Sequence, residues 1–173
     1  DWYRETVFYE VWVRSFHDSD GDGIGDLNGI RKKLDYIESL GVGGLWLTPF
    51  YPTPYFDSGY DVADYTAVDP VYGTLEDLDA LIAEAHGRGI RIFTDLVMNH
   101  TSSEHSWFKE SASSKTSAKR DWYVWAPEPA SPCSQVEEDV FGASRWELDE
   151  VTGEHYYHMF YAEQPDLNYR NPE

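Results

Sequence analysis

The densest set of metal-ligating side chains in the sequence lies near its start, in DSDGDGIGD (residues 18–26). Its aspartates match positions 1, 3, 5 and 9 of a calcium-binding loop, and a glycine falls where such a loop turns sharply. An isoleucine carbonyl falls at position 7, and this mixture of carboxylates and carbonyl favours calcium over magnesium. The spacing therefore predicts a calcium site with these ligands: Asp18, Asp20, Asp22, Ile24 (through its carbonyl) and Asp26.

One position of this stretch departs from the EF-hand pattern. Position 12 of an EF-hand loop is a bidentate glutamate, whereas this sequence has Gly29 there. The stretch therefore resembles an EF-hand loop that lacks its last ligand. A solvated acidic turn is the alternative interpretation, because Asp-Gly pairs are strong turn formers.

A second group of polar residues lies in FDSGYD (residues 56–61), where Asp57 and Tyr60 are three positions apart in a glycine-containing loop. A carboxylate accepts hydrogen bonds from hydroxyl groups, and an aromatic face packs against the apolar face of a sugar ring. We therefore expect these two side chains to point into a sugar-binding cleft.

A third group lies in TDLVMNH (residues 94–100). Asp95 has apolar neighbours, so we expect it to be inside the protein with a polar partner. Asn99 and His100 follow at the strand exit, which is where α/β proteins keep their active sites. The alternative is that Asp95 anchors a neighbouring arginine or backbone group, while His100 only caps the strand.

The elements that position these groups follow a β-α-β-α-β order. Residues 6–16, 43–50 and 90–100 are rich in β-branched, aliphatic or aromatic side chains and predict strands. Apolar residues at helical spacing predict one helix that stops at Gly41 and a second that is N-capped by Thr74. Such an order is typical of a parallel sheet with right-handed crossovers.

The sequence after His100 lacks a long period. We expect irregular structure there, with a short helix near residues 107–112 and a strand near residues 155–161. The lysine- and serine-rich run at residues 113–120 is expected to be an exposed loop.

Composition excludes several classes of partner. The net charge of −19 over 173 residues is unsuited to nucleic acid or an anionic membrane surface, because both require a cationic patch. An acidic protein with 16% aromatic residues suits a neutral substrate. The only cysteine, Cys133, allows no intrachain disulfide and no thiolate cluster. No apolar run is long enough for a membrane span, no targeting segment is visible, and the compartment stays open.

The motifs in their order resemble the α-amylase superfamily of glycoside hydrolases and transglucosidases, and more narrowly its oligo-1,6-glucosidase, α-glucosidase and trehalose-synthase branch. The motifs that carry the resemblance are YEVWVRSFHDSDGDGIGDLNGI, LWLTPFYPTP, DSGYDVADY, GTLEDLDALIAEAHGRGIRIFTDLVMNHTS and QPDLN. One departure is VFGASRW, where the branch often reads FFGGSAW, so that Arg145 stands in place of a small residue.

The resemblance implies an α/β fold: the N-terminal part of a (β/α)8 TIM barrel, with an inserted, irregular α+β domain B after the third strand. Residues 1–100 would form the first three βα units, residues 101–165 domain B, and residues 166–173 the return towards the barrel. The remainder of the barrel would then be a partner of this chain.

The resemblance also implies roles for individual residues. The aspartates and isoleucine of residues 18–26 would bind a structural calcium ion, as in that branch, and Asp95 would be the structural aspartate of the third strand. The substrate would be an α-glucan or oligosaccharide. Its non-reducing glucose would be held by these residues: Asp57, Tyr60, His100, Phe141, Phe160 and Gln164.

The chemistry of the family requires two carboxylates in the retaining arrangement, an aspartate nucleophile and a glutamate acid/base. Both are expected beyond Glu173, after the fourth and fifth strands, so the 173 residues alone should be inactive. A (β/α)8 barrel needs about 250 residues, and this sequence offers about three of its eight strands. The chain is therefore interpreted as the N-terminal portion of a retaining α-glucoside hydrolase or transglucosidase.

Two other classes of protein stay open. One is a non-catalytic relative of the family, in which the barrel serves interaction. Against it stands the joint presence of Asp57, Tyr60, Asp95 and His100, since a dead site needs no sugar ligands. The other is a small calcium-binding interaction module, suggested by the acidic loop alone.

Overall fold

The computed structural model describes residues 1–128, 140–142 and 144–173, so Cys133 lies outside the described residues. The chain folds into two compact units. Unit 1 consists of residues 1–52 and 66–96, and unit 2 consists of residues 53–65 and 97–173.

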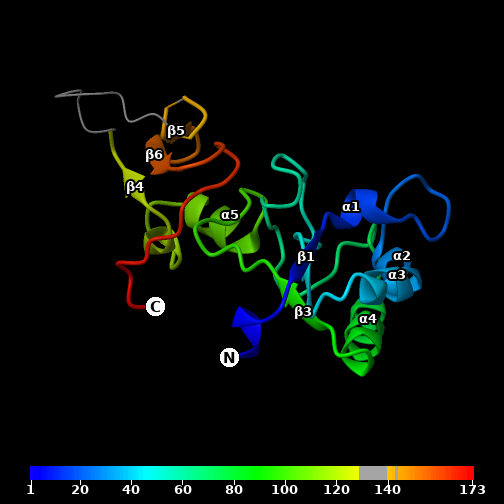
Figure 1. The fold of residues 1–173 in the computed structure, drawn as a ribbon. Coiled ribbons are helices and arrows are strands. Elements are labelled where there is room, and N and C mark those ends of the chain that lie inside the picture. The colour runs from blue at the N-terminus through cyan, green and yellow to red at the C-terminus, as the bar shows by residue number, and fades with distance from the viewer. Residues whose placement is uncertain (129–139, 143) are drawn as a thin grey trace. The chain divides into compact units, whose positions relative to one another are not determined.

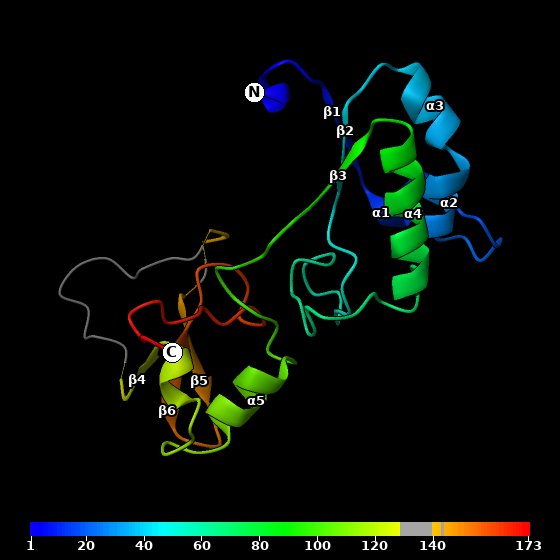
Figure 2. The same ribbon diagram turned by 90° about the horizontal axis from the view of Figure 1, so that it is seen from below.

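Unit 1 is built on a parallel three-stranded sheet of order β1-β2-β3 (β1 and β3 are labelled in Figure 1, all three strands in Figure 2). The strands are β1 (Phe8–Val11), β2 (Gly44–Leu47) and β3 (Arg91–Thr94). Their register pairs Tyr9 with Leu45 and Leu45 with Ile92. The parallel β-α-β-α-β prediction is confirmed, although each strand is shorter than its apolar run.

Three helices cover one side of this sheet: α2 (Leu27–Lys32), α3 (Leu34–Ser39) and α4 (Leu75–Gly87) (Figure 2). Their apolar stripes and the facing strand residues form one core. Its fully enclosed aliphatic members include Leu27, Ile30, Leu34, Ile37, Leu45, Leu47 and Leu81. Burial of such side chains is the main stabilising term, at about 1.5–3 kcal/mol each.

The expected strand at residues 6–16 is only half correct. β1 ends at Val11, and a one-turn helix follows, α1 (Val13–Phe16). The turn brings Val13 into the core, and the hydroxyl of Thr48 accepts a hydrogen bond from its N–H at 3.3 Å. The aromatic and β-branched residues favoured a strand throughout this segment. A helical turn of four residues is too short to produce a periodic pattern in the sequence.

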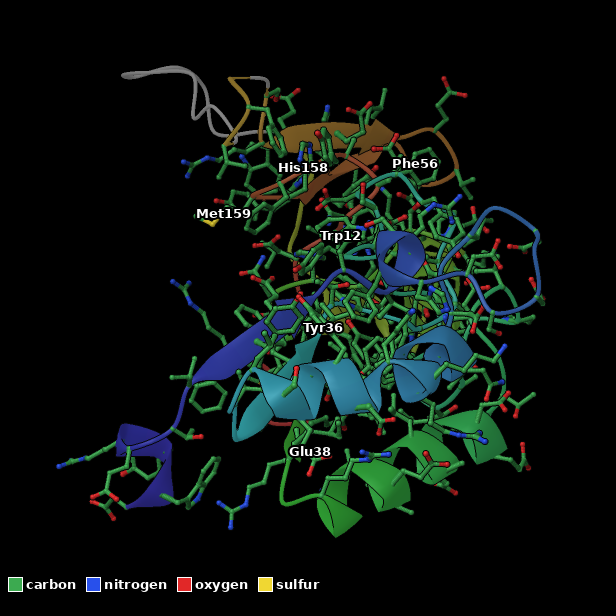
Figure 3. All side chains as sticks on the ribbon, turned by 45° about the vertical axis from the view of Figure 1, so that its right-hand side comes forward. Trp12, Tyr36, Glu38, Phe56, His158 and Met159 are labelled. Carbon is green, nitrogen blue, oxygen red and sulfur yellow. The ribbon has the colours of Figure 1, made fainter. Side chains whose placement is uncertain are left out.

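The first predicted helix is divided in two at Lys33, whose backbone angles (φ −107°, ψ 8°) interrupt the α conformation. Buried residues keep their helical spacing across this break, and the sequence pattern therefore does not reveal it. Glu38 on α3, which is labelled in Figure 3, forms a salt bridge with Arg88, the residue after α4. A pair with side chains this exposed contributes at most about 1 kcal/mol.

The α4 helix begins as the sequence predicted. The hydroxyl of Thr74 accepts a hydrogen bond from the N–H of Asp77 at 3.2 Å, and the Asp77 carboxylate accepts one from the Thr74 N–H at 3.0 Å. The amide of Asn28 donates to the same carboxylate at 2.8 Å, which joins α2 to α4 and lowers the pKa of Asp77. The expected N-cap at Thr74 is therefore confirmed, and Asp77 completes a capping box with it.

Unit 2 contains the α5 helix and an antiparallel sheet of order β4-β6-β5. The helix is α5 (Ser106–Ala112), which confirms the short helix expected near residues 107–112. The strands are β4 (Trp125–Ala126), β5 (Trp146–Asp149) and β6 (Glu154–Tyr157). The expected strand at residues 155–161 is shorter than its aromatic run. The part of the chain that the structure describes also contains two single-turn 3₁₀ helices, η1 (Trp2–Arg4) in unit 1 and η2 (Arg120–Trp122) in unit 2.

A buried cation ties α5, η2 and β6 together within unit 2. The Arg120 guanidinium lies 3.4 Å from the centre of the Trp125 ring and donates to the backbone carbonyl of Ser111 at 3.2 Å. It also pairs with the Glu154 carboxylate, and this pairing lowers the pKa of Glu154.

Arg145, which stands where the family branch often has a small residue, donates a hydrogen bond to the Tyr157 hydroxyl at 3.2 Å.

The domain boundaries expected at residues 100 and 165 stay a prediction, since compact units of this chain are not the same as domains of a complete barrel.

Among the described residues, no helix combines the length and apolarity needed to cross a membrane.

Candidate functional site

The loop that carries Asp57 is organised by a second, fully buried carboxylate. Asp61 accepts hydrogen bonds from the backbone N–H groups of Phe56 at 2.9 Å and of Asp57 at 3.0 Å. Tyr55 and Ser58 adopt positive φ angles of 65° and 53°, which cost energy in residues with a side chain. The Asp61 carboxylate therefore holds a strained turn in place and sets the position of Asp57.

His100 lies inside unit 2, with 4% of its surface exposed. Its Nε2 is 3.1 Å from the carbonyl oxygen of Tyr60, and its Nδ1 is 3.3 Å from the amide nitrogen of Asn99. Burial lowers the pKa of His100, against the opposing effects of the Tyr60 carbonyl and the nearby carboxylates of Asp57 and Asp61. The imidazole is therefore neutral near pH 7.

Gln164 connects His100 to Asp57 from a distant part of the chain. Its carbonyl oxygen accepts a hydrogen bond from the Tyr161 N–H at 3.1 Å, and its amide nitrogen donates to Asp57 Oδ2 at 2.9 Å. These two bonds fix the orientation of the buried amide. The same amide nitrogen lies 2.9 Å from His100 Nε2, so two nitrogen atoms meet beside one carboxylate.

The two aromatic residues expected near the sugar have different surroundings. The Phe160 ring lies 5.2 Å from the His100 ring, so it belongs to the same group. Phe141 stacks on Tyr161 with ring centres 4.1 Å apart, and 53% of its surface is exposed. Five of the expected residues therefore gather in unit 2: Asp57, Tyr60, His100, Phe160 and Gln164.

Asp95 belongs to unit 1, where it follows β3. Its Oδ1 accepts a hydrogen bond from the indole N–H of Trp46 at 3.0 Å. The two residues border a pocket of about 220 Å³ with Phe8 and Phe93. Asp95 was expected to be inside the protein, but it is only partly buried, because it lies just beyond the end of β3. Its expected polar partner is the indole of Trp46 in β2 and not an arginine.

The acidic loop of unit 1 folds so that its first three aspartates face one another. One carboxylate oxygen from each of Asp18, Asp20 and Asp22 lies within 4.8 Å of the other two. Oxygen ligands 2.3–2.6 Å from a calcium ion have such separations, so the loop fits this ion. Backbone N–H groups, chiefly those of Gly21 and Gly23, lower the pKa of Asp18 and keep it ionised.

The carboxylate cluster consists of Asp18, Asp20 and Asp22 and does not include Asp26, the fourth carboxylate expected as a ligand. Asp26 caps α2: its carboxylate accepts hydrogen bonds from Gly29 N–H at 2.6 Å and Ser19 N–H at 2.8 Å. A Cβ at Gly29 would come within 1.8 Å of the His17 carbonyl oxygen. This contact explains why a glutamate cannot stand at position 12. The Ile24 N–H donates to Asp22 Oδ1 at 2.7 Å.

Sequence reasoning missed two polar residues of the group in unit 2: Asp61 and Asp166. Each acts through the backbone or through another side chain, so its residue type gave no signal of a role. Asp166 stands out in the structure, because burial raises its pKa to about 6 while hydrogen bonds from the Met159 N–H and the Asn99 amide oppose the rise.

The group in unit 2 has the hydrogen-bonding pattern that a sugar hydroxyl requires. A hydroxyl donates one hydrogen bond and accepts two. The Asp57 carboxylate is an acceptor, and the Gln164 amide is a donor 2.9 Å from it. His100 Nε2 lies 2.9 Å from the same amide nitrogen and can donate or accept according to its tautomer. The nearby Phe160 ring offers an apolar surface to the ring of a sugar.

Known proteins resemble this chain over nearly its whole length. An α-glucosidase of Candida albicans is 51% identical over 177 residues, which cover 99% of this chain and 31% of that protein. An oligo-1,6-glucosidase of Heyndrickxia coagulans is 49% identical, with 99% of this chain and 31% of that protein covered. The chain thus spans about a third of the length of these relatives.

Solved structures agree. A mutant of MutB in complex with sucrose has a TM-score of 0.93 and 46% identity, over 99% of this chain and 31% of that one. A related structure identifies MutB as a trehalulose synthase. A Bacillus licheniformis trehalose-6-phosphate hydrolase has a TM-score of 0.93 and 44% identity, with 98% of this chain and 31% of that chain covered.

The family model for the α-amylase catalytic domain matches residues 10–173, which include all of unit 2, unit 1 from residue 10 onward, and every residue of the group around His100. These similarities confirm the resemblance found in the sequence motifs. They also agree with an α/β fold that corresponds to the N-terminal part of a TIM barrel. The chain therefore belongs to the α-amylase catalytic-domain family.

Proposed function

We propose that this chain is the N-terminal portion of a retaining α-glucoside hydrolase or transglucosidase that acts on α-linked glucose oligosaccharides. The observation that carries the proposal is the contact of Asp57 Oδ2 and His100 Nε2 with the amide nitrogen of Gln164, each at 2.9 Å. This contact places a hydrogen-bond acceptor and an amide donor side by side, as a sugar hydroxyl requires. The names of the similar proteins support it, since they are hydrolases of α-glucosides and a trehalulose synthase.

In this proposal the chain supplies the binding of a terminal glucose, and carboxylates outside it supply bond cleavage. Asp57 accepts hydrogen bonds from sugar hydroxyls, while His100 and Gln164 donate to them. The Phe160 ring excludes water and packs against the sugar ring. Binding by these residues orients the anomeric carbon for attack by the nucleophile of a retaining mechanism.

The test uses the full-length protein that contains this chain. Hydrolysis of p-nitrophenyl α-glucoside, maltose, isomaltose, trehalose and starch is measured, and the anomer released first is identified by NMR. A retaining enzyme releases α-glucose first. The substrate series separates oligosaccharide hydrolysis from action on starch, and product analysis at high sugar concentration detects transfer.

A substitution at the carboxylate links activity to the site. Asp57→Ala removes an ionised acceptor, and each hydrogen bond to a charged group contributes about 1.5–3 kcal/mol, so kcat/KM should fall at least about 10- to 100-fold. Asp79→Asn, on the exposed side of α4, is the matched control and should leave kcat/KM unchanged. Full activity of the Asp57→Ala protein would contradict the proposed site.

We also propose that the acidic loop binds a structural calcium ion through Asp18, Asp20, Asp22, the Ile24 carbonyl and Asp26. The closeness of the first three carboxylates supports this proposal. Chelation should then lower the melting temperature of the full-length protein, and added calcium should restore it. Activity at low temperature should be unchanged. A melting temperature that does not respond to chelator would contradict the calcium site.

A further inference from the structure

His105 is the residue that precedes α5 (labelled in Figure 1), and its side chain caps the first turn of this helix. Its backbone is extended (φ −63°, ψ 140°), and its Nδ1 accepts a hydrogen bond from the Trp107 N–H at 3.1 Å. The His105 carbonyl accepts the hydrogen bond of the Lys109 N–H at 3.1 Å. A histidine therefore occupies a position at which serine, threonine, aspartate and asparagine are preferred.

The hydrogen bond from Trp107 fixes the hydrogen of the neutral imidazole. A backbone N–H can only donate, so Nδ1 must be unprotonated and the hydrogen must be on Nε2. A protonated imidazole carries hydrogen on both nitrogens and accepts no hydrogen bond. Its positive charge would also lie at the positive end of the α5 dipole. Protonation of His105 therefore removes the cap and repels the N–H groups of the first turn.

The surroundings of His105 favour the neutral ring. The residue is 6% exposed, and its ring packs against that of Tyr65 with ring centres 5.7 Å apart. Burial lowers the pKa of His105, and the neighbouring carboxylate of Asp64 opposes this effect. The Glu104 carboxylate, on the preceding residue, pairs with the Lys109 ammonium at 2.6 Å. The cap is therefore held in its neutral form by enclosure, against one nearby negative charge.

The capping side chain also contacts residues outside α5. The His105 ring lies 4.6 Å from the Trp107 ring, which in turn lies 5.1 Å from the ring of Trp122 in η2. The Tyr65 ring, which packs on the same imidazole, carries a hydroxyl 2.9 Å from the His100 carbonyl. A change at the cap therefore affects residues in contact with η2 and with the segment that carries His100.

We propose that His105 is a pH-sensitive cap: its neutral ring holds the first turn of α5, and protonation of the ring releases this turn. Because the pKa of His105 is lowered in the fold, the cap should be complete above the ordinary histidine pKa of 6.5 and lost as the pH falls through the lower folded pKa. The contacts that carry this inference lie within unit 2 and do not depend on the proposed function.

The experiment measures amide hydrogen exchange in the full-length protein, by mass spectrometry of peptides from α5. The unsubstituted protein is compared with a His105→Asn protein at each pH from 4.5 to 8. Asparagine is a strong capping residue that gains no charge in acid, so its amide oxygen can accept from the Trp107 N–H throughout this range. Comparison at equal pH cancels the pH dependence of the chemical exchange step.

Above pH 7 the two proteins should differ by a constant factor, since asparagine does not reproduce the packing of the ring. As the pH falls below 6.5, exchange in α5 of the unsubstituted protein should become faster relative to the asparagine protein by about 2- to 30-fold, the effect of one lost cap. A His105→Ala protein lacks the cap at every pH, so its ratio to the asparagine protein should stay constant.

A constant ratio between the unsubstituted and asparagine proteins from pH 8 to pH 4.5 would show that His105 acts only through packing, and would overturn the proposal. If the asparagine protein does not fold, His105→Ser gives the same comparison, because a serine hydroxyl also caps.

Protonation of the ring is measured separately, through deuteration of the carbon between its two nitrogens in a peptide of residues 101–112, which contains no other histidine. The midpoint should lie below pH 6.5 and coincide with the rise in amide exchange. A midpoint at or above this value, or a rise in exchange at a different pH, would also overturn the proposal.

Discussion

Removal of the Asp61 carboxylate should disturb both the stability of the loop at residues 55–61 and its ability to present Asp57. The side chain is fully buried and accepts two backbone hydrogen bonds, from Phe56 and Asp57. Two substitutions separate the contributions. Asp61→Ala removes both acceptors, and Asp61→Asn keeps the shape while placing an NH₂ group where one acceptor oxygen was.

The size of the effect follows from these two bonds. Hydrogen bonds to a charged group contribute about 1.5–3 kcal/mol each, which gives an upper range of about 3–6 kcal/mol for Asp61→Ala. The Phe56 side of the turn is exposed, so water can satisfy one of the two N–H groups. We therefore expect a loss of about 2–4 kcal/mol for Asp61→Ala. Asp61→Asn should lose about 1–3 kcal/mol, because its NH₂ group faces a backbone N–H.

The assay is urea denaturation of the full-length protein followed by tryptophan fluorescence, together with kcat/KM for an α-glucoside. Both substitutions should lower the denaturation midpoint and reduce kcat/KM, since the strained turn relaxes and Asp57 loses its place beside Gln164. Asp79→Asn, an exposed carboxylate on α4, serves as the control. An Asp61→Asn protein that matches this control in both measurements would refute the role assigned to Asp61.

Two further predictions concern stability. Pairing with Arg120 lowers the pKa of Glu154, so the pair should stabilise the fold above the ordinary carboxyl pKa of 4.5 and lose its effect as the pH falls through the lower folded pKa. Urea denaturation of a Glu154→Gln protein at several pH values should show its deficit relative to the unsubstituted protein shrinking in acid; a constant deficit would contradict the pairing. Gly29→Ala places a Cβ against a backbone carbonyl and should cost about 1–3 kcal/mol or more, whereas Gly87→Ala meets no atom within 4 Å and should be neutral or slightly stabilising. Equal melting temperatures for these two glycine variants would show that the close approach at Gly29 is not rigid.

Local sequence signals were sufficient for most elements of unit 1. The alternation of apolar runs with helical periods predicted the parallel strand order, and Thr74 with Asp77 marked the start of α4. These features depend on residues within a few positions of one another, because apolar spacing and a capping side chain act locally on the backbone. Where two local signals competed, as at residues 12–16, composition did not distinguish a strand from a single helical turn.

The candidate sugar site was predicted as a set of residues and not as an arrangement. Asp57 and His100 could be singled out because a carboxylate and an imidazole in polar loops are chemically conspicuous. Their contact with Gln164, which is 107 positions from Asp57, could not be predicted, because local sequence patterns do not indicate which distant loops lie together in the fold. The resemblance to a known family supplied Gln164, and the structure supplied its hydrogen bonds.

Some decisions belong to tertiary structure alone. Asn99 could be singled out at the exit of a strand, but its hydrogen bond to Asp166, 67 positions away, is visible only in the structure. Likewise, Gly29 reads as a missing calcium ligand until the backbone of His17 is seen to occupy the space of its side chain. The sequence by itself determined which groups can donate, accept or bind a cation. The fold decided which of them face one another, because burial leaves each polar group only the partners that packing brings within reach.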